Sequence, residues 1–145
     1  MSCGLSIIGT DLDIDAFVSK TEMSGFNKSY KGDPISKVNP KKRKYSFVSM
    51  IISEASFNDI KSQINDSVAF LIKYQDNLRH IADTPEIEYA TINFGVDSII
   101  DEEHLTQSFY FPISLIKICA ELGIGIELSI YKEDMQEILE REKLD

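Results

Sequence analysis

The sequence has no tryptophan, and it has only two cysteines and two histidines. Cys3 and Cys119 lie far apart without a C-x-x-C spacing, so we expect two reduced thiols and neither a disulfide framework nor a redox motif. His80 and His104 have no cysteine or second histidine at ligand spacing, whereas zinc sites need three or four such ligands. The sequence therefore predicts no metal site.

Long apolar runs are also missing. No stretch approaches the roughly 20 apolar residues that span a bilayer, and the first residues lack a basic flank followed by an apolar region. We therefore expect a soluble, cytoplasmic protein without membrane contact.

The 145 residues are 43% hydrophobic and 27% charged, which is typical of one compact domain and excludes disordered and fibrous classes. We expect residues 1–145 to form a single domain. The formal net charge of −9 argues against binding to nucleic acid, because neutralisation of phosphates supplies most of that affinity. A basic protein partner fits this charge better.

Charge is unevenly distributed along the chain. Residues 20–44 carry eight basic and two acidic side chains, whereas the rest carries seven basic and 22 acidic ones. Gly25, Gly32, Pro34 and Pro40 interrupt this segment, which has no sustained hydrophobic period. The pattern predicts a long basic surface loop over residues 21–44, with more mobility than the remainder of the free protein.

Elsewhere the hydrophobic period alternates between two and 3.6. Period two predicts strands over residues 5–8, 45–52, 89–96, 109–111 and 124–131. Helical spacing and capping residues predict helices over residues 13–20, 57–81 and 113–122, and a terminal amphipathic helix that contains Met135, Ile138 and Leu139. The order βαβαββαβ plus a C-terminal helix indicates an α+β fold, with a mainly antiparallel sheet of about five strands and helices packed on one face.

Several of these segments together resemble a bacterial domain-of-unknown-function family, the one numbered 4279. The resemblance rests on the order and spacing of Leu5 to Gly9, Asp11 to Lys20, Lys31-Gly32, Tyr45 to Ser53 and Leu122 to Tyr131. The family often has a tryptophan where the second strand begins, and this chain has Tyr45 and Phe47 there. The family has no established enzyme activity. Because some relatives are encoded beside bacterial toxins, the resemblance implies an immunity function.

Patterns that would indicate other chemistry are incomplete. Asp11, Asp13, Asp15 and Glu22 reproduce part of a calcium-loop spacing, but Ala16 stands where that loop needs glycine. Acidic residues at a helix N-terminus explain the same spacing. Cys119 lies within an apolar stripe, which favours a buried and inert thiol over a nucleophile. We therefore predict no enzyme activity and no cofactor.

The sequence thus predicts a non-enzymatic binding protein, with immunity by complex formation with a basic bacterial toxin or effector domain as the leading hypothesis. The candidate partner-binding residues are the acidic ones at Asp97, Asp101, Glu102, Glu103, Glu133, Asp134 and Glu137. A solubilising surface explains the same residues. The alternative is a small-ligand or peptide-binding module that uses the aromatic second strand and the basic loop, in which Lys41, Lys42, Arg43 and Lys44 form the strongest positive run. The oligomeric state is left open.

Overall fold

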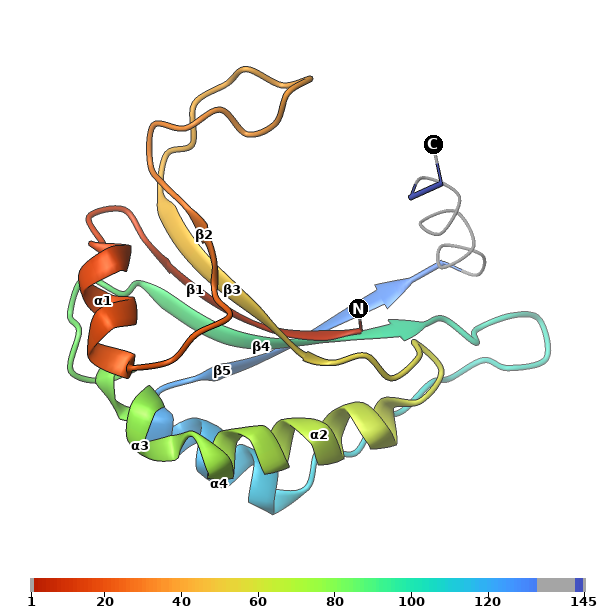
Figure 1. The fold of residues 1–145 in the computed structure, drawn as a ribbon. Coiled ribbons are helices and arrows are strands. Elements are labelled where there is room, and N and C mark those ends of the chain that lie inside the picture. Colours follow the sequence, from red (N-terminus) through yellow and green to blue (C-terminus); the bar gives the residue numbers. More distant parts are fainter. Residues whose placement is uncertain (1, 133–142, 145) are drawn as a thin grey trace.

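The computed structural model describes residues 2–132 and 143–144, and within them five strands form one curved sheet (Figure 1). The strands are β1 (Cys3–Gly9), β2 (Asn27–Ser29), β3 (Ser46–Ser53), β4 (Tyr89–Asp97) and β5 (Gly125–Tyr131). Their order across the sheet is β2-β3-β1-β4-β5. Neighbouring strands are antiparallel, except that β5 runs parallel to β4.

The helices are α1 (Ile14–Thr21), α2 (Ile60–Lys73), α3 (Gln75–Leu78) and α4 (Ile113–Leu122), with a 3-10 turn at Arg79–Ile81. Figure 1 shows α2, α3 and α4 together beneath the sheet and α1 at one end of it. The opposite face of the sheet carries no described helix, and we call it the open face. The predicted α+β class, with helices on one face of the sheet, is confirmed.

Local signals explain where the helices begin and end. The Asp13 carboxylate accepts a hydrogen bond from the Ala16 N–H at 3.1 Å and caps α1. Asp59 caps α2 in the same way through the Ser62 N–H, also at 3.1 Å. Gly123 ends α4 with a φ of 73°, a left-handed conformation that glycine adopts without the steric cost that a Cβ brings.

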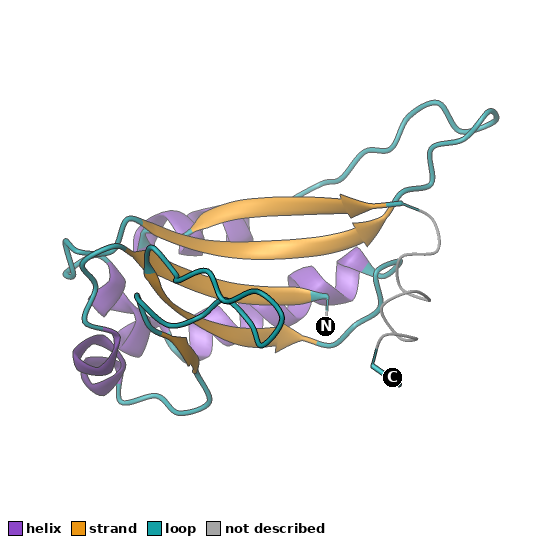
Figure 2. Cartoon of the chain, turned by 90° about the horizontal axis from the view of Figure 1, so that it is seen from above, coloured by secondary structure: helices purple, strands orange, loops and turns teal. Residues whose placement is uncertain are grey.

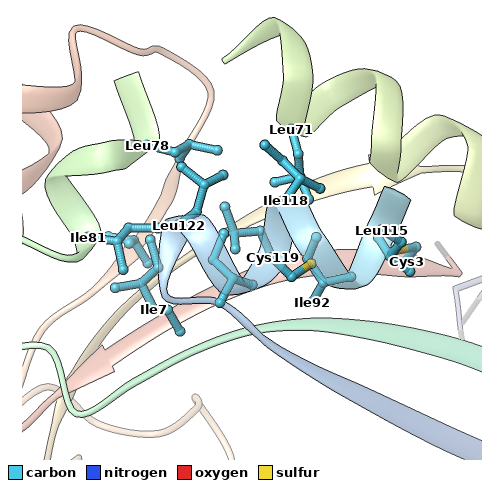
Figure 3. Packing of buried hydrophobic residues seen from close by; sticks show 14 of the residues in the cluster. Cys3, Ile7, Leu71, Leu78, Ile81, Ile92, Leu115, Ile118, Cys119 and Leu122 are labelled. Carbon is cyan, nitrogen blue, oxygen red and sulfur yellow. The ribbon is translucent and has the colours of Figure 1, made fainter. Parts of the chain in front are cut away.

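Alternate strand residues build the core against the helices (Figure 3). Leu5, Ile7, Val48, Ile92 and Phe94 are fully buried on this face of the sheet. From the helices, the buried side chains include Ile14, Phe17, Leu71, Leu78, Leu115, Ile118, Cys119 and Leu122. The period-two and period-3.6 patterns of the sequence therefore identify the face that each of these elements buries.

The element order differs from the prediction in three places. Residues 109–111 form no strand, since no strand of the described residues pairs with them, and Phe111 packs on Phe94 with ring centroids 5.5 Å apart. The basic loop contains β2, which pairs with β3. The long helix predicted over residues 57–81 begins at Ile60 and is interrupted at Tyr74. The predicted C-terminal helix with Met135, Ile138 and Leu139 lies outside the described residues.

Candidate functional site

The most prominent feature of the surface is the connection from β4 to α4, residues 98–112, which we call the acidic arm. It extends well beyond the end of the sheet (Figures 1 and 2). Ile99, Ile100, Leu105 and Tyr110 are exposed by 55%, 56%, 78% and 78%. Single exposed apolar residues are ordinary, but four on one projecting segment make the arm a candidate surface for binding another molecule.

The tip of the acidic arm is a turn organised by Asp101. Its Oδ1 atom accepts hydrogen bonds from the backbone N–H groups of Glu103 at 2.8 Å and His104 at 2.6 Å. The Asp101 N–H donates to the His104 carbonyl at 3.0 Å. These backbone hydrogen bonds hold the pKa of Asp101 below its ordinary value. Asp101 therefore shapes the turn, and Glu102 and Glu103 are exposed on it.

At the base of the acidic arm, the side chain of Gln107 links the two sides of the arm. Its Nε2 atom donates to the Asp97 carbonyl at 2.9 Å, and its Oε1 atom accepts from the Ile99 N–H at 3.2 Å. A cavity of about 310 Å³ lies beside this base, with Phe57 and Phe109 among its lining residues. Because the two sides of the arm are held together before binding, less conformational entropy is lost when a partner docks.

The structure places the predicted acidic residues differently from one another. Glu102 and Glu103 lie at the exposed tip of the arm, whereas Asp97 is half-buried at the end of β4. The Oδ1 atom of Asp97 is buried and has no hydrogen-bond partner among the described residues. Glu133, Asp134 and Glu137 lie outside the described residues. The structure thus brings together Asp101, Glu102 and Glu103 on one turn, with Asp97 at its base.

A second feature is a hollow of about 330 Å³ on the open face of the sheet. Small uncharged residues contribute to its lining, namely Gly4, Ser6, Ser49, Asn93 and Gly95, and the aromatic residues Phe57 and Tyr131 lie at one side. The two rings stack with centroids 5.2 Å apart. A Cβ at Gly95 would lie 3.3 Å from each ring, so glycine permits this close packing on the sheet. The hollow offers hydroxyl and amide groups beside an aromatic surface.

The basic loop folds back on itself as an irregular hairpin. The Gly32 N–H donates to the Arg43 carbonyl at 2.9 Å, and the Arg43 N–H donates to the Asp33 carbonyl at 2.8 Å. The Arg43 guanidinium lies 5.0 Å from the centroid of the Phe47 ring, as cation–π pairs do. In Figures 1 and 2 the loop rises from β2 and β3 and bends over the open face. The strand predicted over residues 45–52 is β3, so Arg43 of the basic loop and Phe47 of β3 meet at one border of that face.

Residues considered for other chemistry have structural roles. Asp13 is the cap of α1, and Asp15 accepts hydrogen bonds from Lys28 at 2.8 Å and Tyr30 at 2.9 Å. Cys3 and Cys119 are buried and free, and burial raises the pKa of each thiol to about 11. Among residues 2–132 and 143–144 no group of three histidine, cysteine, aspartate or glutamate side chains is placed to hold a metal ion.

Comparison with models of known families, with curated proteins and with solved structures gave no match. The resemblance to the domain-of-unknown-function family therefore stays a prediction. Within the described part of the chain, no helix has the length and apolar composition needed to cross a bilayer.

Sequence reasoning identified the acidic residues of the arm but missed its apolar ones and Gln107. The available signal was the pair of apolar segments, Ile99-Ile100 and Leu105, that flank the acidic run without a helical or strand period. An unperiodic apolar segment beside a charge run is compatible with exposure, but only the fold shows that nothing in the described residues covers it. Gln107 carried no signal, because glutamine is common on surfaces.

Proposed function

We propose that the chain is a non-enzymatic binding protein that neutralises a basic bacterial toxin or effector domain by holding it in a complex in the cytoplasm of the producing cell. The observation that carries this proposal is the acidic arm, which presents exposed apolar side chains and exposed carboxylates on a hydrogen-bonded turn. The resemblance to a family with relatives encoded beside toxins supports the same function.

The arm combines the two properties that fast and specific protein association uses. Exposed apolar side chains such as Leu105 and Tyr110 bury area in the complex and slow dissociation. Glu102 and Glu103 attract a basic surface and accelerate the encounter, as does the net charge of −9. Inhibition then follows from steric occlusion of the toxin, without bond chemistry.

The test is association kinetics with the product of the gene immediately upstream. The association rate is expected to fall as salt rises from about 50 to 500 mM, because salt screens the attraction. Reversal of Glu102 and Glu103 to lysine is expected to lower the association rate at low salt by about tenfold. Asp101 is left unchanged, because its replacement would also remove the hydrogen bonds that shape the turn.

Matched variants separate local attraction from net charge. Asp83→Lys with Glu86→Lys changes the net charge equally on two exposed residues near the other end of the sheet. We expect this control to lower the association rate by less than about threefold. Leu105→Ser is expected to accelerate dissociation and to leave the association rate nearly unchanged. Equal effects of the two double reversals would contradict docking through the arm.

A second candidate function is supported by the hollow on the open face, which has a volume typical of small-molecule sites. Its hydroxyls, amides and aromatic side fit a neutral polar ligand or a short peptide, and the basic loop borders it. The test is a thermal-shift screen of sugars, nucleosides and dipeptides. Ser6→Leu fills the hollow and is expected to remove any shift, whereas the exposed Ser114→Leu is its control.

A further inference from the structure

The two edge strands of the sheet, β2 and β5, differ in length and in residue composition. The border at β2 has only three strand residues, and Lys28 within it forms an ion pair with Asp15 at 2.8 Å. It then continues into the basic loop. The border at β5 has seven strand residues, GIELSIY, with no proline, no lysine and no bulge against β4. Short strands and lysines discourage pairing between molecules, and β5 has neither feature.

The backbone groups on the outer side of β5 belong to identifiable residues. The Tyr131 carbonyl accepts a hydrogen bond from the Ser98 N–H at 2.7 Å, so the polar backbone groups of Tyr131 point toward β4. Because these groups alternate along a strand, Ile126, Leu128 and Ile130 direct their N–H and C=O groups away from β4. In the described part of the chain, no strand pairs with that side of β5.

We propose that two copies of the chain associate through this edge, with β5 pairing antiparallel to β5 of the second copy and Leu128 at the two-fold axis. This register aligns Ile126 with Ile130 of the other copy. Each aligned pair of residues whose backbone groups point toward the other copy exchanges two hydrogen bonds. A two-fold axis through Leu128 therefore satisfies the outer backbone groups of all three residues in both chains.

The side chains on both faces suit this register. On the helix side, Ile126, Leu128 and Ile130 continue as one apolar row across the axis, and Ile130 is exposed by 53% in the single chain. On the open face, Glu127 lies opposite Ser129 of the second copy, so no two carboxylates stand opposite each other. Asn93 Nδ2 donates to Glu127 Oε1 at 2.9 Å and to Ser129 Oγ at 2.8 Å, which draws both side chains toward β4. The edge is thus complementary to itself.

The experiment is sedimentation equilibrium of the full chain at concentrations from about 1 to 200 µM, where mass action reports dimerisation. We expect a species of twice the 16.4 kDa of one chain. Ile130→Lys is expected to weaken the association at least tenfold, because it removes apolar contact and places a lysine at the edge. The matched control is Ile72→Lys on α2, where the isoleucine is exposed by 54% and lies away from the edge.

Amide hydrogen exchange tests the register itself. The amides of Ile126, Leu128 and Ile130 are expected to exchange slowly at high concentration and quickly on dilution or in Ile130→Lys. Those of Glu127 and Ser129 point toward β4 and are expected to stay slow in both conditions. A chain that stays monomeric at about 200 µM would overturn the proposal. So would a dimer in which the amides of Ile126, Leu128 and Ile130 exchange as quickly as in the monomer.

Discussion

Gly9, at the end of β1, is a position where the structure leaves no room for a side chain. A Cβ there would lie 2.3 Å from the Glu86 carbonyl oxygen and 2.8 Å from the Leu12 Cβ, whereas ordinary contact begins near 3.4 Å. The obstruction at Glu86 is backbone, which a rotamer change cannot relieve. Gly9→Ala therefore requires the segment around Glu86 to move away from β1.

The expected cost can be worked from these contacts. Overpacking of a filled site typically costs 1–3 kcal/mol, and a clash with backbone belongs at the upper end, about 3 kcal/mol. Displacement of this segment also weakens the hydrogen bond from the Glu88 N–H to the Ile8 carbonyl, now 2.9 Å, by about 1 kcal/mol. The smaller entropy of the unfolded alanine chain offsets about 0.5–1 kcal/mol. The free energy of unfolding is expected to fall by about 3 kcal/mol.

Urea unfolding at a fixed protein concentration measures this loss. With a denaturant slope of about 2 kcal/mol/M, the midpoint is expected to fall by about 1.5 M. The matched control is Gly125→Ala in β5, where a Cβ would meet its nearest atoms at 3.7 and 3.8 Å. This control is expected to be neutral or stabilising by about 0.5 kcal/mol. A Gly9→Ala midpoint within about 0.3 M of the control would refute the steric reasoning.

Other predictions concern the buried thiols and the basic loop. Cys119→Ala is expected to lower the free energy of unfolding by about 1 kcal/mol in urea unfolding, and to leave the affinity of the folded protein for its partner unchanged. Rapid labelling of Cys119 by a thiol reagent in the native protein would contradict its burial. Burial raises the pKa of Cys119 from 9.0 to about 11, so between these pH values the thiol stays protonated in the native state and ionises in the unfolded state. Unfolding then releases a proton, and the free energy of unfolding is expected to fall between pH 9 and 11 by more in the wild type than in Cys119→Ala. Neutralising Lys41, Lys42, Arg43 and Lys44 together is expected to change affinity for a basic partner by less than about threefold, and a hundredfold loss would show that the loop binds directly.

The sequence predictions are correct where the residues of an element decide its structure, and they fail where a distant segment of the chain decides it. Leu5 and Ile7, or Ile92 and Phe94, alternate with less buried residues because one face of each strand is packed, and that pattern is written in the sequence. Phe109 and Phe111 show the same alternation but form no strand, since pairing depends on a neighbour that the sequence does not specify. Conversely, residues 27–29 are polar and form a strand only because β3 lies beside them. The charge pattern of the sequence indicated the acidic residues of the candidate site. The hydrogen bonds of Gln107 depend on the path of the arm, which the sequence does not show.

The proposed dimer and the proposed docking surface are compatible in geometry and predict the composition of the complex. The acidic arm leaves the sheet at the end of β4, and β5 runs parallel to β4. A two-fold axis at Leu128 reverses the second copy, so its arm extends from the opposite end of the joined sheet. Each arm then remains free to bind one partner, and the complex contains two copies of each protein.

Ile130→Lys is expected to convert this complex to one copy of each while the affinity of a single arm stays within about twofold, since Ile130 lies outside the arm. Light scattering of the purified complexes distinguishes the two stoichiometries, and a parallel loss of affinity would instead place β5 in the partner interface.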